Sequence, residues 1–386
     1  MKKLTHLATI FVLFSLAYQC APAGEEADVD ETEAYFDDFL PAENKWGFLD
    51  TTGSLIIPPR FDQVGSFAEG LCPVNSGGKW GYIDSLGNWV IEPQYKGAWG
   101  FHRGLARVWK FTDDYAFIHA NNQEIIHPDY AEVNDFTHGR IRVSDGERTG
   151  FLDLHGNLVI PLQYQSASDF NRAGLSKVKL DNKYGMIDTT GRMTVRAEYE
   201  WMGTPGDRYL TVRIDHQYAL LDMSNGKLLD GRYQQVAEPM DRRIAVKKND
   251  QWSILDTDSG REIPIKGDPV QGLGLDRWAA YNVDAWDLLD GDGNVLNGKG
   301  FKQINRYQEG LACCRQGDYW GYLAPDGKLA IRPTFGLAWD FVNGFARVAG
   351  NKGTYFLNPH GEELYQSDWL DLRDFVNGRC PVQIRN

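Results

Sequence analysis

The segment Asp290-Gly291-Asp292-Gly293-Asn294 has residue types that could bind a calcium ion. Acidic residues at alternate positions open the calcium loop of an EF-hand. That loop also needs Gly at its sixth position and Glu at its twelfth, where this chain has Val295 and Phe301. The segment stands at a place where similar segments of the chain have a tight turn. We therefore expect a structural turn here, with a weak metal site as the alternative.

Other catalytic patterns are missing from the sequence. The eight histidines form no HExxH pair, no G-x-S-x-G motif occurs, and Gly291-Asp292-Gly293 lacks the third glycine of a dinucleotide loop. Several aspartates recur at one position of a repeating pattern, which indicates that they hold turns. These are Asp50, Asp84, Asp153, Asp188, Asp222, Asp256 and Asp290. We expect no catalytic residue, no metal and no cofactor, although the fold could bring a carboxylate pair together.

Two tryptophans outside the repeating pattern are candidates for binding. Trp99 and Trp339 occupy equivalent places, each two residues before a phenylalanine. Arg103, Arg107 and Arg347 are near them in sequence and could donate hydrogen bonds to a ligand. Tryptophan beside polar groups suits sugars and peptides. Packing between repeats explains the same residues and is the simpler alternative.

The overall charge argues against nucleic acid as a partner. The chain has 386 residues, a net charge of −13 and 42% hydrophobic residues, and a pI of about 5.1. This composition is typical of a folded protein. An acidic chain without a basic stripe repels phosphate.

The amino terminus has the features of an export signal. Residues 1–19 combine a positive start with an apolar run that is too short to span a membrane. Cys20 follows this run, as at a bacterial lipoprotein processing site, although Gln19 replaces the usual small residue. Residues 20–38 are expected to form the lipid-anchor site and an acidic tether. We expect a cell-envelope protein, an outer-membrane lipoprotein facing the periplasm or the surface; the alternative is signal cleavage near Ala21 or Ala23.

A short motif repeats along the remaining chain with a step near 34 residues. Lys45-Trp46-Gly47-Phe48-Leu49-Asp50 recurs as Lys79-Trp80-Gly81-Tyr82-Ile83-Asp84, and again from Tyr319 to Leu323. A turn glycine, a β-branched run with proline, an aromatic residue and a Phe-x-x-Gly segment follow in fixed order. Internal repeats of this length are typical of propellers and solenoids.

This pattern resembles the WG-repeat family of bacterial proteins. The resemblance covers residues 39–386 and is weakest in the fifth to eighth copies. It implies an all-β protein with a binding or scaffolding role and says little about activity.

Each repeat predicts three short strands. In the first copy these are Trp46–Asp50, Ser54–Ile57 and Leu71–Val74, with Pro58-Pro59 ending the second strand because proline lacks the ladder N–H. About ten such three-stranded units must stack to bury their faces. The stack could be a propeller-like ring or an open superhelical array, and exposed edge strands favour the ring. We expect Cys72, Cys313, Cys314 and Cys380 to be small apolar fillers, with one disulfide as the alternative.

We therefore expect a non-enzymatic interaction module at the cell envelope. It would bind a protein or a glycan through one face of the repeat array and contact the membrane through the lipid anchor only. The main alternative is a hydrolase of envelope polymer whose site only the fold assembles. A structural spacer without a partner is the third possibility.

Overall fold

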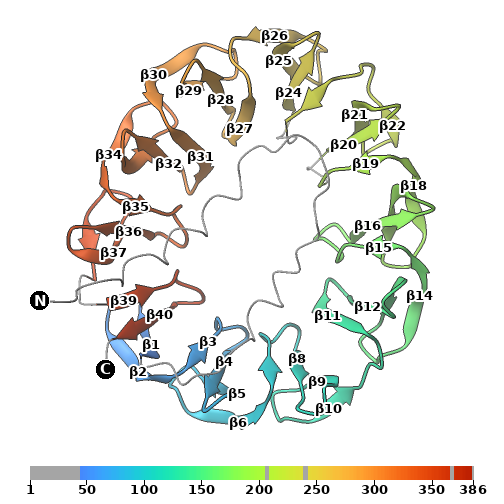
Figure 1. The fold of residues 1–386 in the computed structure, drawn as a ribbon, viewed down its shortest axis with the longest axis vertical. Coiled ribbons are helices and arrows are strands. Elements are labelled where there is room, and N and C mark those ends of the chain that lie inside the picture. The colour runs from blue at the N-terminus through green and yellow to red at the C-terminus, as the bar shows by residue number, and fades with distance from the viewer. Residues whose placement is uncertain (1–43, 205–207, 238–241, 366–368, 385–386) are drawn as a thin grey trace, which may run out of the picture. The chain divides into compact units, whose positions relative to one another are not determined.

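The computed structural model describes residues 44–204, 208–237, 242–365 and 369–384. Cys20 and the expected signal and tether lie outside these residues. The described chain forms ten four-stranded antiparallel sheets, which follow one another around a ring (Figure 1). We call these sheets blades and number them along the chain.

The first five blades have these strands, from the centre of the ring outwards. Blade 1 has β3 (Gln63–Val64), β4 (Leu71–Ser76), β5 (Lys79–Asp84) and β6 (Trp89–Tyr95); blade 2 has β7 (Gly97–Ala98), β8 (Ala106–Trp109), β9 (Tyr115–Ile118) and β10 (Glu124–Ile126); blade 3 has β11 (Glu132–Thr137), β12 (Arg140–Ser144), β13 (Thr149–Leu152) and β14 (Leu158–Tyr164); blade 4 has β15 (Ser166–Ala167), β16 (Leu175–Leu180), β17 (Lys183–Asp188) and β18 (Met193–Tyr199); blade 5 has β19 (Trp201–Met202), β20 (Tyr209–Ile214), β21 (Gln217–Asp222) and β22 (Lys227–Leu228).

The other five blades complete the ring. Blade 6 has β23 (Gln235–Val236), β24 (Arg243–Lys248), β25 (Gln251–Asp256) and β26 (Glu262–Ile265); blade 7 has β27 (Val270–Gly274), β28 (Arg277–Asn282), β29 (Ala285–Leu289) and β30 (Val295–Phe301); blade 8 has β31 (Gln303–Gln308), β32 (Leu311–Gln316), β33 (Tyr319–Leu323) and β34 (Leu329–Phe335); blade 9 has β35 (Leu337–Ala338), β36 (Ala346–Gly350), β37 (Gly353–Leu357) and β38 (Glu363–Leu364); blade 10 has β39 (Trp369–Leu372), β40 (Arg379–Ile384), β1 (Lys45–Asp50) and β2 (Leu55–Phe61).

Blade 10 closes the ring with strands from both ends of the chain. β1 pairs with β40 along its whole length, from Lys45 opposite Ile384 to Asp50 opposite Arg379. Contacts across the closure add to this ladder: the Asn377 side chain donates to the Phe67 carbonyl at 2.6 Å. The closed propeller, one of the two arrays that the sequence allowed, is therefore confirmed.

Each blade has four strands, so the three-stranded unit expected from the sequence is wrong. The missing strand is the innermost one, which has only two residues in several blades, such as β3 and β7. So short a strand gives no detectable alternation of apolar and polar residues. The expected strand end at Pro58-Pro59 is also wrong, because β2 continues through both prolines to Phe61. β2 is an outermost strand, where a missing N–H leaves no neighbour unpaired.

The glycine of the repeat motif is required by the outer strand of its own blade. A Cβ atom at Gly81 would lie 2.4 Å from the Ile91 carbonyl oxygen, and Gly47, Gly150, Gly185 and Gly321 meet the equivalent carbonyl. In these five blades the outer strand has seven residues and a shifted register. Where Ala116, Ala219, Ser253 or Tyr355 replaces the glycine, the outer strand has two to four residues.

Neighbouring blades are joined by aromatic pairs that are 19 residues apart in sequence. The Phe48 and Phe67 ring centroids lie 5.1 Å apart, and four further boundaries have the same pair. Those pairs are Tyr82–Phe101, Phe151–Phe170, Tyr322–Phe341 and Phe356–Phe375. At the outward boundaries of blades 5 to 7 the first aromatic residue becomes Leu220, Ile254 or Leu288. The expected packing of the recurring aromatics between units is thus confirmed.

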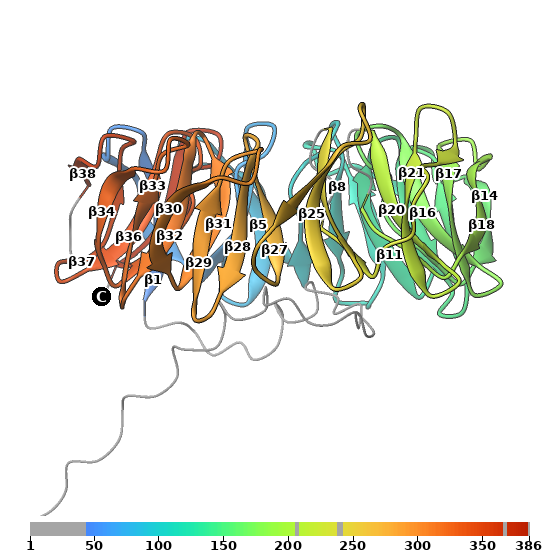
Figure 2. The same cartoon turned by 90° about the horizontal axis from the view of Figure 1, so that it is seen from above.

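The fold divides the connections between two faces. The hairpins between the second and third strands of the blades lie on one face, which we call the hairpin face; the loops between first and second strands and the turns between third and fourth strands lie on the other, the turn face (Figure 2). The cysteines Cys72, Cys313, Cys314 and Cys380 are free and buried, which confirms their role as fillers.

We predict that Gly81→Ala lowers the free energy of unfolding by about 2–3 kcal/mol, because the new methyl group overlaps a backbone carbonyl. Urea unfolding followed by tryptophan fluorescence measures this loss. Ser253→Ala is the matched control, because that blade already accepts a side chain at this position, and it should change stability by less than about 0.5 kcal/mol. Equal effects of the two variants would contradict the role assigned to the glycine.

Candidate functional site

The structure places Trp99 and Arg107 between blades 2 and 3. The Arg107 guanidinium lies 3.8 Å from the Trp99 ring centroid, and its Nε atom lies 2.8 Å from Asp135 of blade 3. Arg107 also donates to the Val133 carbonyl and is only 7% exposed. These contacts explain the pair as a connection between blades, and a role in ligand binding stays a prediction.

Trp339 and Arg347 repeat this arrangement between blades 9 and 10. The guanidinium lies 4.2 Å from the Trp339 ring centroid and donates to the Leu372 carbonyl. Its Nε atom lies 3.9 Å from Asp374, the counterpart of Asp135. The sequence correctly indicated that the two tryptophans are equivalent, but the aspartate partner lies 27 residues after each arginine and was not identified.

Arg103 is at the tip of a turn on the turn face. Its φ angle is 51°, and its backbone N–H donates to Glu69 of blade 1 at 2.6 Å. The N–H of Gly104 donates to the other oxygen of Glu69 at 2.8 Å. The carboxylate of one blade therefore holds the turn of the next, and the exposed Arg103 side chain remains available to a ligand.

Three consecutive blades depart from the repeat on the turn face. The residue before the second strand is a glycine with positive φ in seven blades: Gly70, Gly104, Gly139, Gly174, Gly310, Gly344 and Gly378. In blades 5, 6 and 7 it is Arg208, Arg242 and Asp276. Glycine is the residue that suits such a turn best, so its loss in three neighbouring blades calls for another explanation.

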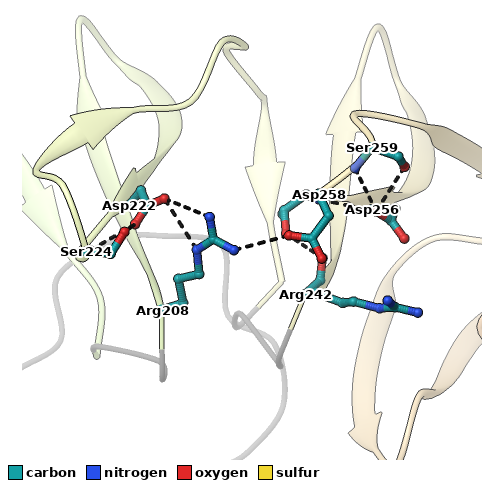
Figure 3. Close-up of polar contacts among 8 residues, drawn as sticks. Arg208, Asp222, Ser224, Arg242, Asp256, Asp258 and Ser259 are labelled. Atoms are coloured by element: carbon teal, nitrogen blue, oxygen red, sulfur yellow. Dashed lines mark hydrogen bonds and ion pairs between the residues drawn. The ribbon is translucent and has the colours of Figure 1, made fainter.

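Arg208 joins blades 5 and 6 through two aspartates. Its Nη2 atom lies 3.2 Å from Asp222 of its own blade, and its Nη1 atom lies 3.1 Å from Asp258 of the next blade. Figure 3 shows the guanidinium between these two carboxylates, with the Arg242 guanidinium directed away from them. Asp222 is buried, whereas the side chains of Arg208 and Asp258 are 50% and 52% exposed.

Arg243 continues the same arrangement from blade 6 to blade 7. Its Nη1 atom lies 2.9 Å from Asp276, and its Nη2 atom lies 3.6 Å from Asp292. About half or more of each of these aspartate side chains is exposed. Arginines and aspartates therefore alternate over three blades. We call this set the charged strip: Arg208, Asp222, Arg242, Arg243, Asp256, Asp258, Asp276 and Asp292.

The recurring aspartates hold turns, as the sequence predicted. Asp290 accepts hydrogen bonds from the backbone N–H groups of Asp292 and Asn294 at 2.9 and 2.8 Å. Asp84 accepts the same pair from Leu86 and Asn88. The segment that resembled a calcium loop is thus a turn of the repeat. Among the described residues, no group of three or more His, Cys, Asp or Glu side chains is placed to hold a metal ion.

An open depression of 420 Å³ lies between blades 8 and 9, lined by Arg332, Phe335, Lys352, Tyr355 and Glu363 among others. Lys352 and Tyr355 both contact its carboxylate, Glu363, at 2.9 and 3.2 Å. In the part of the chain that the structure covers, no helix is long and apolar enough to cross a membrane.

The turn aspartates should make stability fall in acid. Hydrogen bonds from Thr190 lower the pKa of Asp188 to about 2, and those from Ser224 lower the pKa of Asp222. A carboxyl group whose pKa is depressed by folding stabilises the fold above its unfolded pKa, near 4, and loses this effect as the pH falls through the folded pKa. We therefore predict a declining unfolding temperature between about pH 4 and 2. Carboxyl NMR titration tests the assignment, and an Asp188 midpoint near 4 would contradict it.

Comparison with known proteins supports the repeat and adds no function. A search of the curated proteins finds no match. Two solved structures cover most of the chain: BamB from Moraxella catarrhalis, with 11% identity, a TM-score of 0.35 and coverage of 88% of this chain and 98% of that one, and a eukaryotic initiation factor, with 8%, 0.46, 83% and 95%. The model of the WG containing repeat matches five segments of this chain, residues 46–80, 80–108, 115–148, 150–184 and 320–352.

Proposed function

We propose that this chain is a non-enzymatic interaction module of the cell envelope that binds a protein partner through the charged strip on its turn face. The observation that carries the proposal is the replacement of glycine by Arg208, Arg242 and Asp276 in three neighbouring blades. The proposal includes a lipid anchor at Cys20, which would hold the ring at the outer membrane.

The need for stability does not explain this replacement. Seven blades form the same turn with glycine, and ion pairs between exposed side chains contribute about 1 kcal/mol or less. Arg208 and its partner Asp258 are half exposed. Residues that break a repeat without an evident gain for the fold are candidates for function.

The chemistry of the strip favours a protein over a neutral glycan. Alternating fixed charges provide specificity and faster association with a surface of complementary charge. Arg242, whose exposed guanidinium is directed away from Arg208 (Figure 3), is suited to pair with a carboxylate of the partner. An acidic glycan would meet the aspartates of the same strip, which repel it.

Crosslinking in intact cells, followed by purification and mass spectrometry, tests the proposal. We expect the full-length chain to capture one recurrent protein and the double variant Arg208→Glu, Arg242→Glu to lose it. Arg192→Glu is the matched control, because Arg192 is an exposed arginine that pairs with Asp188 of its own turn in blade 4. The control should retain the partner.

Equal capture by the charge-reversed variant would overturn the assignment of the strip. Capture of polysaccharide in place of a protein would favour a glycan partner instead. Circular dichroism of each variant shows whether the fold is intact, since removing Arg208 leaves the buried Asp222 with Ser224 as its neighbour.

One observation favours the hydrolase alternative. Burial raises the pKa of Asp340, at the centre of the ring, and the nearby Asp374 carboxylate raises it further. A carboxyl group with a raised pKa is suited to act as a general acid. We predict that the purified chain releases no reducing ends from cell-wall polysaccharide. Release that disappears in Asp340→Asn would contradict the non-enzymatic proposal.

A further inference from the structure

Two hairpins on the hairpin face present apolar side chains to solvent. Phe111 is 57% exposed between β8 and β9, and Val283 is 92% exposed between β28 and β29. The other described hairpins have Gly, Asp, Asn, Glu, His or Lys at their tips, such as Asp215-His216 and Asn249-Asp250. A side chain as exposed as Val283 contributes almost nothing to the core of its own chain.

Val283 is also in an unfavourable backbone conformation. Its φ angle is 55°, in the left-handed region, where the equivalent residues of other blades are Asn182, His216 and Asp250. A β-branched residue in this region is a true outlier that costs about 1–3 kcal/mol and indicates a function outside the fold. A buried contact with another molecule would recover that cost.

The two apolar tips lie on opposite sides of the ring. Phe111 belongs to blade 2 and Val283 to blade 7, so five of the ten blades separate them in either direction. Figure 1 shows the β8–β9 and β28–β29 hairpins across the ring from each other. A twofold axis in the plane of the ring can therefore place the Phe111 tip of one copy against the Val283 tip of another, and the reverse contact follows by symmetry.

The same axis brings opposite charges together at other hairpins. It sets blade 1 against blade 8, where Lys79 meets Asp318. It sets blade 3 against blade 6, where Glu147 meets Lys248, and blade 4 against blade 5, where Lys183 meets Asp215. Five of these six side chains are exposed and Lys183 is half-buried, and Asp318 also pairs with Lys302 of its own chain. Charge complementarity of this kind fixes the register of an interface.

We propose that the hairpin face binds a second copy of this chain, face to face, around this twofold axis. The proposal stands apart from the partner site on the turn face, which the dimer leaves exposed. The other possible occupant, an unrelated protein, would have no reason to match charges related by a twofold axis.

Cysteine crosslinking of full-length chains tests the proposal. We expect an equimolar mixture of Phe111→Cys and Val283→Cys chains to form disulfide-linked dimers under mild oxidation, because the axis places these residues opposite each other. Neither variant alone should crosslink, since the two copies of residue 111 lie on opposite sides of the ring.

The native cysteines give little background. Burial raises the pKa of Cys314 and Cys380 to about 12, and Cys72 and Cys313 are also buried. The parent chain, with all five cysteines, sets the background from Cys20. Leu86→Cys and Leu154→Cys, exposed on the turn face, form the control mixture that should stay uncrosslinked.

Sedimentation equilibrium provides an independent readout. We expect a dimer for the parent chain, a monomer for Glu147→Lys, and a dimer again for Glu147→Lys combined with Lys248→Glu. A monomeric parent chain, or crosslinks within either cysteine variant alone, would overturn the proposal. A mixture that crosslinks no better than the turn-face control would overturn it as well.

Discussion

β1 and β40 join the two ends of the chain in one blade, and every other blade depends on this contact. A strand edge that faces water exposes a row of unpaired N–H and C=O groups and invites association. In blade 10 the amino-terminal β1 receives its inner neighbour from the carboxyl-terminal β40. The repeat begins with the third strand of a blade, so this closure is a consequence of where the motif starts. Ten blades then share one closed surface.

The boundaries between blades are not equivalent, and this difference locates the candidate site. Where the aromatic pair is present, burial of two rings holds the neighbours together, as Phe48 and Phe67 do at the closure. At the two boundaries between blades 5 and 7 the aromatic partner is Leu220 or Ile254, and Arg208 and Arg243 bridge the same boundaries on the turn face. Ion pairs of this exposure cannot replace the lost burial in energy. They do create a surface with a charge pattern that the regular blades lack.

Much of the fold could be predicted because a repeat gives the same evidence ten times. The third strand, the aspartate turn and the free cysteines are determined by local residue types, and the structure agrees with them. The innermost strand was missed because two residues, such as Gly97 and Ala98, have no periodicity to detect. The run through Pro58 and Pro59 was assigned as a strand end because the sequence does not show that β2 is an outer strand. The candidate site was found only in part, since Arg208 and Asp258 are 50 residues apart and only the stacking of two blades brings them together.

Hydrogen–deuterium exchange of the full-length chain tests the closed ring, on which both proposed surfaces depend. The account predicts that the amides of β1 and β40 exchange as slowly as those of β4 and β5, the equivalent strands of blade 1, because all four lie inside a complete ladder. Fast exchange at β1 and β40, with protection rising towards the middle of the chain, would contradict it. That result is the behaviour of an open array that frays from its ends.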